Sequence, residues 1–131
     1  MNNLEDYLPK DKSDFESLIL LKKLTHSEFE QLLPELLTWT QDINWPIAPK
    51  IIDELLIPLG KDLVPWLKPI LLSKEYDWIY TVLWYLVRKL EKEVIYELKD
   101  EFVLLSQTKD VNFIEFEIPD MAKEILLSIH N

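Results

Sequence analysis

Apolar residues recur along most of this chain at spacings of three and four, which is the period of an amphipathic α-helix. The pattern is clearest after Thr25, where one helix face collects five large apolar side chains. These are Phe29, Leu32, Leu33, Leu36 and Leu37. Alternation of apolar and polar residues, which is typical of a half-buried strand, is clearest in the short segment 114–118. The hydrophobic pattern therefore predicts an all-α fold.

Capping residues and prolines indicate where the helices begin and end. Three pairs have the spacing of a capping box, namely Ser13 with Glu16, Thr25 with Glu28 and the alternative Ser27 with Glu30. Pro34 should kink or split the second helix, because its ring meets the carbonyl four residues earlier. We expect about six to seven helices, over 14–24, 25–41, 48–56, 61–72, 75–90, 91–106 and 119–129.

Two segments do not read as regular helix. Residues 1–12 are expected to form an irregular N-terminal lead-in, and residues 107–118 a loop before the last helix. A strand at 114–118 would have no sheet to join, so we favour a loop that holds Phe113 and Phe116 against the core. At 131 residues the chain fits one domain, and we expect a single helical domain over 1–131.

The predicted helices come as short pairs that repeat about every 33 to 35 residues. Trp45 and Trp78 are one such correspondence, and Pro34 and Pro65 are another. Periods of this size are typical of α-solenoids, in which each pair buries a face against the next. We therefore expect a short α-solenoid of HEAT-like pairs, an α–α superhelix, with an irregular helical bundle as the alternative.

Composition and charge narrow the classes of partner. The net charge of −10 disfavours nucleic acid and anionic membranes, because both repel an acidic surface. Residues 91–131 hold ten acidic and four basic groups, so a basic protein or peptide would suit that end. The chain lacks cysteine, a signal-like N-terminus and an apolar run of the ~20 residues that cross a bilayer. A cytoplasmic location is expected, and the oligomeric state stays open.

A cluster of four residues, Asp42, Asn44, Trp45 and Pro46, is the sharpest local signal. In the structural interpretation, Asn44 caps a helix, Trp45 packs between helices and Asp42 accepts backbone amides at the positive helix end. In the functional interpretation, the same groups line an edge where repeat proteins bind partners. We favour the structural interpretation, because such a corner must be built in one way.

A second candidate is an aromatic ridge at i,i+4 spacing along the predicted 75–90 helix. The ridge consists of Tyr76, Tyr80, Trp84 and Arg88. Arg88 could stack over Trp84, and aromatic residues with arginine are frequent anchors of protein interfaces. The opposite face of that helix is also apolar, so the ridge is either central in the stack or an exposed binding surface. Burial is the more frequent outcome, but this is the expected place for a binding surface.

Residues with catalytic or ligating chemistry do not form a recognisable site. Glu93, Glu97, Asp100 and Glu101 share one predicted helix face, which is typical of a solvated acidic stripe rather than a metal site. Phosphate loops and nucleophile elbows need glycines, and Gly60 is the only glycine. We therefore expect no catalytic residue, no metal and no cofactor.

Several segments resemble the bacterial domain-of-unknown-function 5071 (DUF5071) family. They are residues 8–14, residues 33–39, residues 41–48 with their Asp-x-Asn-Trp-Pro motif, and residues 56–60. The resemblance covers roughly residues 7–120. It implies a HEAT-like helical fold and a stand-alone bacterial protein, and it brings no established activity.

Two classes of function follow from the sequence. The favoured hypothesis is a non-enzymatic module that binds a protein or peptide, for example an immunity-type or regulatory partner of a basic protein. The alternative is an enzyme or small-ligand-binding protein with a site on a concave, helix-lined face. Homo-oligomerisation through the aromatic ridge is a third option.

Overall fold

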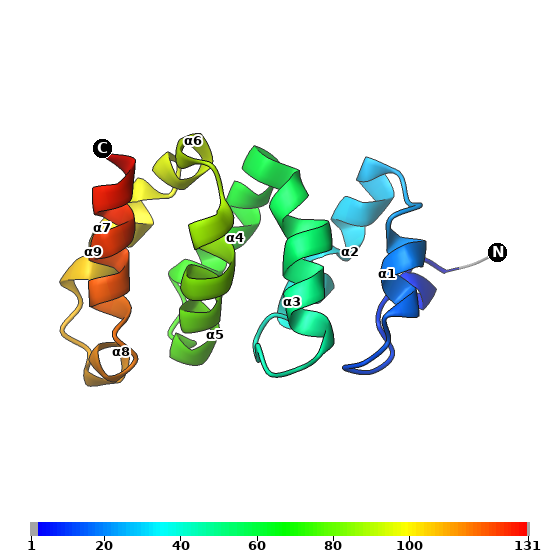
Figure 1. The fold of residues 1–131 in the computed structure, drawn as a ribbon, viewed down its shortest axis with the longest axis horizontal. Coiled ribbons are helices and arrows are strands. Elements are labelled where there is room, and N and C mark those ends of the chain that lie inside the picture. Colours follow the sequence, from blue (N-terminus) through cyan, green and yellow to red (C-terminus); the bar gives the residue numbers. More distant parts are fainter. Residues whose placement is uncertain (1–2, 131) are drawn as a thin grey trace. The chain divides into compact units, whose positions relative to one another are not determined.

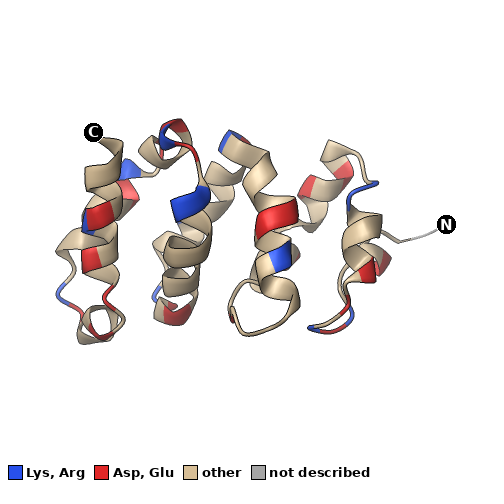
Figure 2. Ribbon diagram, in the orientation of Figure 1, with Lys and Arg blue, Asp and Glu red and all other residues tan. Residues whose placement is uncertain are grey.

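The computed structural model describes residues 3–130, and every regular element among them is helical (Figure 1). The α-helices are α1 Glu16–Leu21, α2 His26–Thr38, α3 Ile47–Ile51, α4 Val64–Leu71, α5 Tyr76–Thr81, α6 Lys92–Tyr96, α7 Lys99–Gln107, α8 Val111–Glu115 and α9 Ile118–Ile129. The 3₁₀ segments are η1 Leu4–Tyr7, η3 Ile57–Leu63 and η5 Val87–Lys89, and the π-helical turns are η2 Ile52–Leu56 and η4 Val82–Leu86. The predicted all-α fold is confirmed. Charged residues are spread over many of these elements (Figure 2).

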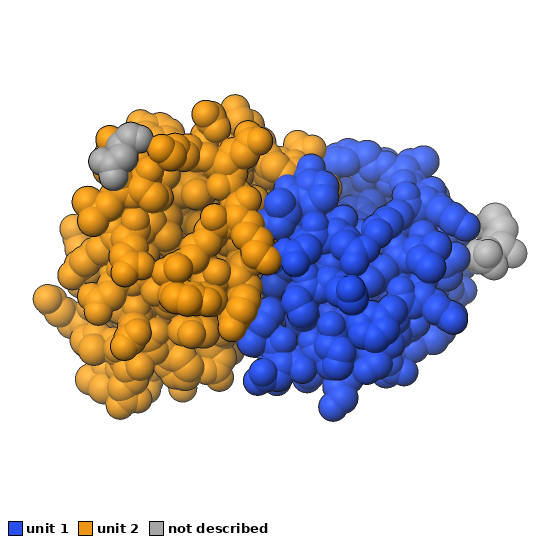
Figure 3. All heavy atoms as spheres, viewed as in Figure 1, with its two compact units in different colours: residues 1–58 blue, residues 59–131 orange. Residues whose placement is uncertain are grey.

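The chain separates into two compact units, residues 1–58 and residues 59–131 (Figure 3). Unit 1 contains α1 to η2, and unit 2 contains α4 to α9. The single domain over 1–131 and the solenoid of HEAT-like pairs stay predictions. The two residue pairs that suggested a repeat, however, do not occupy equivalent positions relative to their helices. Trp45 precedes α3 whereas Trp78 lies within α5, and Pro34 lies inside α2 whereas Pro65 lies in the first turn of α4.

In unit 1, helix α2 starts as its capping box predicts. The Thr25 hydroxyl accepts the Glu28 amide at 3.2 Å, and the Glu28 carboxylate accepts the Thr25 amide at 2.9 Å. The five apolar residues of the predicted stripe are all buried. The first capping box does not form, because the amide of Ser13 donates to the Asp11 carboxylate and α1 begins only at Glu16. The predicted lead-in includes one 3₁₀ turn, η1, while residues 1 and 2 lie outside the described part of the chain.

In unit 2, helix α9 is the central packing element. It contacts α5, α6, α7, α8 and η4, and α7 and α9 run side by side with α8 at one end (Figure 1). Ile118, Met121, Ala122 and Ile125 form its buried face. Pro119 lies in the first turn, where its missing N–H breaks no helical hydrogen bond, as predicted.

The predicted 91–106 helix is wrong in one respect, because it is broken into α6 and α7. The amides of Glu97 and Leu98 donate three residues back, to Val94 and Ile95, and Leu98 leaves the helical conformation at φ −103°, ψ 11°. Glu101 faces inward with Phe102, because it lies three residues after Leu98 and seven after Val94, on the apolar face of the segment. The predicted 107–118 loop is also only partly irregular, since it contains α8. These two differences make the predicted helix count slightly low.

Two helices carry a π-helical turn at a related position. In unit 1 the turn η2 extends α3, and in unit 2 the turn η4 extends α5. The turns start at Ile52 and Val82, and each ends in a fully buried leucine, Leu56 or Leu86. A π turn holds one extra residue per turn and is frequent near functional sites.

Candidate functional site

The predicted aromatic ridge forms a stacked column on α5, η4 and η5. The rings of Tyr80 and Trp84 are parallel within 4°, with centroids 6.4 Å apart. The guanidinium carbon of Arg88 lies 3.7 Å from the Trp84 ring centroid, which is a close cation–π contact. Tyr80 precedes Trp84 along the helix and Arg88 follows it, so the indole is held between the two.

At the Arg88 end of the column, helix α9 supplies an ion-pair partner. The Nη2 atom of Arg88 donates to Oε2 of Glu124 at 2.9 Å. The side chain of Arg88 is 35% exposed and that of Glu124 is 68% exposed. Such an exposed ion pair contributes little to stability, about 0–1 kcal/mol. Its effect is to orient the guanidinium, which Trp84 already holds from one side.

The other end of the column is covered. The Tyr76 ring lies 5.2 Å from Phe116 and 6.3 Å from Phe113, and the Tyr80 ring lies 6.2 Å from Phe116. The segment 107–118 thus holds both phenylalanines against the ridge, although Phe113 does so from within α8. Tyr76 and Tyr80 are half-buried, whereas Trp84 is 41% exposed. The ridge is therefore partly covered at its Tyr76 end and open to solvent at its Trp84–Arg88 end, which we call the open end.

A pocket of about 250 Å³ adjoins the open end of the column. It lies between α9 and the η5–α6 region and is lined by Arg88, Ile95, Glu124, Ile125 and Ser128. The two isoleucines are largely buried and form an apolar floor. Arg88 and Glu124 place opposite charges on the same pocket.

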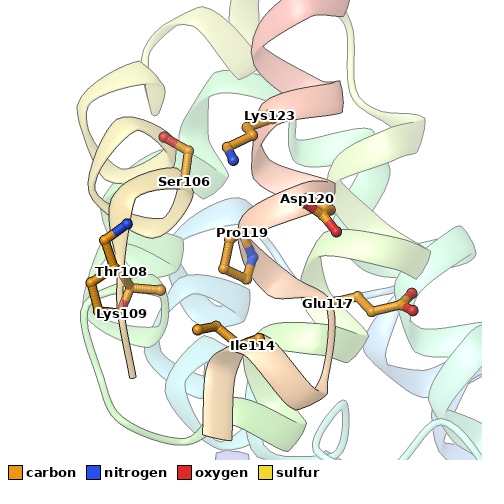
Figure 4. Close-up of a pocket in the computed structure, with 8 residues that line it drawn as sticks. All are labelled: Ser106, Thr108, Lys109, Ile114, Glu117, Pro119, Asp120 and Lys123. Carbon is orange, nitrogen blue, oxygen red and sulfur yellow. The ribbon is translucent and has the colours of Figure 1, made fainter. Parts of the chain in front are cut away.

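A second pocket of about 210 Å³ lies where α7, α8 and α9 meet (Figure 4). Its lining mixes two lysines, Lys109 and Lys123, with two carboxylates, Glu117 and Asp120. Figure 4 shows the Lys123 side chain reaching toward the middle of the pocket and the Glu117 carboxylate pointing away from it. Glu117 has a φ of 59°, which makes it the one non-glycine residue with left-handed backbone among residues 3–130.

The Asp42–Pro46 cluster builds a corner between α2 and α3. The Asp42 carboxylate accepts the Asn44 amide at 2.9 Å, and its carbonyl accepts the Trp45 amide at 3.1 Å. Asn44 does not cap a helix, because α3 starts only after Pro46. The Trp45 ring packs edge-on against Trp39 at 5.7 Å. Each of these contacts shapes the backbone of the corner.

The acidic stripe of the predicted 91–106 helix is divided. Glu93, Glu97 and Asp100 are exposed, but Glu101 is only 9% exposed, and its Oε1 has no hydrogen-bond partner within the described part of the chain. Over residues 3–130, no group of three or more His, Asp or Glu side chains is placed to hold a metal ion. Over the same residues, no helix has the length and apolarity needed to cross a bilayer.

The comparison with protein families adds one finding. The family described as "Domain of unknown function (DUF5071)" matches residues 7–126. The chain belongs to the DUF5071 family. This DUF5071 match includes the Asp42–Pro46 corner, the whole aromatic column and Glu124. No curated protein is significantly similar to the chain.

Sequence reasoning missed the partner of Arg88. Glu124 lies 36 residues further along the chain, and its pairing depends on α9 packing against η4. The i,i+4 spacing was sufficient to find the four members of the ridge, because all belong to one helical segment. A distant carboxylate carries no such local signal.

Proposed function

We propose that this protein is a non-enzymatic module that binds a basic protein or peptide at the open end of the aromatic column. The observation that supports this function is the arrangement of Trp84, an exposed indole held between Tyr80 and Arg88. Trp and Arg are enriched among residues that dominate interface energies. Because both side chains are already ordered, little conformational entropy is lost when a partner binds.

The charge around the column indicates the sign of the partner. Glu124 borders the open end, and Glu91, Glu93 and Glu97 are exposed on and around α6, which contributes Ile95 to the adjoining pocket. An acidic rim attracts a basic partner and mainly raises its association rate. More specifically, we propose that the protein is an immunity-type or regulatory partner of a basic protein.

The test compares wild-type protein with Trp84→Ala and a matched control, Tyr96→Ala. Tyr96 is also an exposed aromatic residue of unit 2 with a cation nearby, since the Lys99 Nζ lies 5.5 Å from its ring centroid. Proteins retained from a lysate of the source cells would be identified, purified and titrated by calorimetry. We expect Trp84→Ala to weaken the Kd by about 30-fold, as for an interface hot spot, and Tyr96→Ala to leave it within about twofold.

Two outcomes would contradict the proposal. One is a partner that binds Trp84→Ala as tightly as wild type. The other is an association rate that is unchanged when salt rises to about 0.5 M, because exposed charges are then largely screened. Self-association through the ridge would appear in light scattering as a wild-type oligomer that Trp84→Ala dissociates.

We also propose a specific helical architecture and a cellular location for the protein. A short solenoid of HEAT-like pairs is supported by the related π turns at Ile52 and Val82. A bacterial, cytoplasmic protein is supported by the resemblance of its motifs and by the lack of cysteine. Small-angle scattering and fractionation of source cells test these two statements.

A further inference from the structure

We propose that the pocket beside Arg88 binds a free aliphatic α-amino acid, a function beyond the proposed protein binding. The pocket combines three features that such a ligand requires. It has a cation, an anion directly beside it and an apolar floor, supplied by Arg88, Glu124 and the pair Ile95 and Ile125. Its volume of about 250 Å³ leaves room for a small side chain.

Arg88 is the carboxylate-binding group. Glu124 is the one acceptor that it contacts among the described residues, through a single Nη2 bond, although a guanidinium has five N–H donors. The Trp84 ring covers one face of the guanidinium at 3.7 Å and leaves the N–H groups at its edge. A carboxylate can therefore bind in the plane of the guanidinium, which is the geometry of strong bidentate pairs.

Glu124 is the ammonium-binding group. Its side chain is 68% exposed, so its second oxygen can accept from a ligand without moving into a buried site. A simple carboxylic acid would be repelled by Glu124, and a simple amine would be repelled by Arg88. A zwitterion that carries both charges on neighbouring atoms satisfies both groups at once. It is also neutral overall, so the net charge of −10 does not oppose its approach.

The apolar floor selects the side chain. Ile95 and Ile125 are 5% and 4% exposed, and the Ser128 hydroxyl donates to the Ile125 carbonyl at 2.6 Å. An aliphatic side chain placed here gains hydrophobic contact, whereas a polar side chain would lose hydration. The pocket of Figure 4 is a weaker candidate, because its lining has no pair of buried aliphatic side chains of this kind.

The experiment is a titration of ¹⁵N-labelled full-length protein with L-leucine, followed through the Trp84 indole N–H and the Arg88 side-chain N–H signals. We expect saturable shifts of both signals with a Kd of about 1 mM or tighter, as suits a ligand of this size. N-acetyl-leucine lacks the ammonium, leucinamide lacks the carboxylate and glycine lacks the side chain. Each should bind at least about tenfold more weakly, since each leaves one feature of the pocket unused.

Two charge-removing variants assign the roles. Glu124→Gln should weaken leucine at least about tenfold and leave N-acetyl-leucine no weaker, because the latter has no ammonium to lose. Arg88→Gln should weaken leucine but not leucinamide. Glu115→Gln, an exposed carboxylate of α8, is the matched control and should bind leucine as wild type does.

The proposal is overturned if the shifts rise linearly without saturation up to about 20 mM leucine. It is also overturned if N-acetyl-leucine or glycine binds as tightly as leucine. These failures are separable from those of protein binding. The partner assay depends on Trp84→Ala and uses no amino acid, so loss of leucine binding alone leaves that function standing.

Discussion

The helix α3–η2 of unit 1 and the helix α5–η4–η5 of unit 2 share a backbone feature but present different surfaces. Each contains a π turn whose last residue is a fully buried leucine. Each is also joined to another helix of its unit by an exposed ion pair, Lys22 with Glu54 in unit 1 and Arg88 with Glu124 in unit 2. The first helix exposes mainly charged side chains near its π turn, whereas the second exposes Trp84 and Arg88.

Figure 2 shows the same contrast along the ribbons. The α3–η2 segment carries both red and blue bands, whereas most of α5–η4–η5 is tan between a red start and a blue end. Both π turns therefore end on a buried face, whatever side chains the exposed face carries. The chemistry of the exposed face is set independently, and only unit 2 presents an aromatic column there among the described residues.

The largest effect should come from the two buried leucines. Leu56→Ala and Leu86→Ala each remove a fully buried side chain at the end of a π turn, so each should lower the free energy of unfolding by about 2–5 kcal/mol. Urea unfolding measures both. A cost below about 1 kcal/mol for either substitution would contradict the tight packing of that leucine at the end of its π turn.

The residues at which the chain leaves the two helices differ in backbone conformation, so we expect substitutions there to affect stability differently. Gly60 follows the first π turn at φ 56°, ψ −126°, a region closed to side chains, while the second helix exits through Leu90 in extended conformation. Gly60→Ala should therefore destabilise the protein by about 1–3 kcal/mol through backbone strain alone, since no atom lies within 4 Å of the added Cβ. Exposed Lys61→Ala is the control in the same unfolding experiment. Equal stability of both variants would contradict the strain.

A smaller effect, of opposite sign, is expected at Glu101. The Glu54 carboxylate of unit 1 is partly exposed and ion-paired, whereas unit 2 buries the Glu101 carboxylate, whose Oε1 has no hydrogen-bond partner among residues 3–130. Because an unsatisfied buried polar group costs about 1–3 kcal/mol, Glu101→Met should raise the free energy of unfolding by about 1 kcal/mol. Exposed Glu97→Met should change it little. A loss of stability in Glu101→Met would show that the carboxylate is satisfied in solution.

The smallest effect concerns the ion pair of unit 1. The hydrogen bond from Lys22 lowers the pKa of Glu54 below its ordinary value, although desolvation partly opposes the shift. A carboxyl whose folded pKa is lowered adds stability above its unfolded pKa and loses it as the pH falls through the folded pKa. Carboxyl ¹³C NMR should show the pKa of Glu54 rising in Lys22→Met and unchanged in Lys61→Met. No rise would mean that the pair does not persist in solution.

Local signals predicted most of the fold. Thr25 and Glu28 are three residues apart, so their capping box depends on little beyond the helix that it starts. Ser13 and Glu16 have the same spacing, but the nearby Asp11 carboxylate accepts the Ser13 amide instead. The break at Leu98 was not predictable either, because it depends on burial of Leu98 and Glu101 against other helices.

The candidate site, like the fold, was only partly predictable from the sequence. The i,i+4 spacing placed Tyr80, Trp84 and Arg88 together, because one helical segment holds all three. It could not decide whether the ridge is exposed, since Phe116 covers the start and leaves the end open. Glu124 and the pocket depend on how α9 packs, and no local pattern encodes that packing.

The Asp42–Pro46 corner has an optical consequence. The indoles of Trp39 and Trp45 lie 5.7 Å apart and are inclined by 67°. At this distance and inclination their electronic transitions couple, and the coupling gives paired circular dichroism bands of opposite sign. That signal requires both rings to keep their relative orientation, so it reports the folding of unit 1 without any added label.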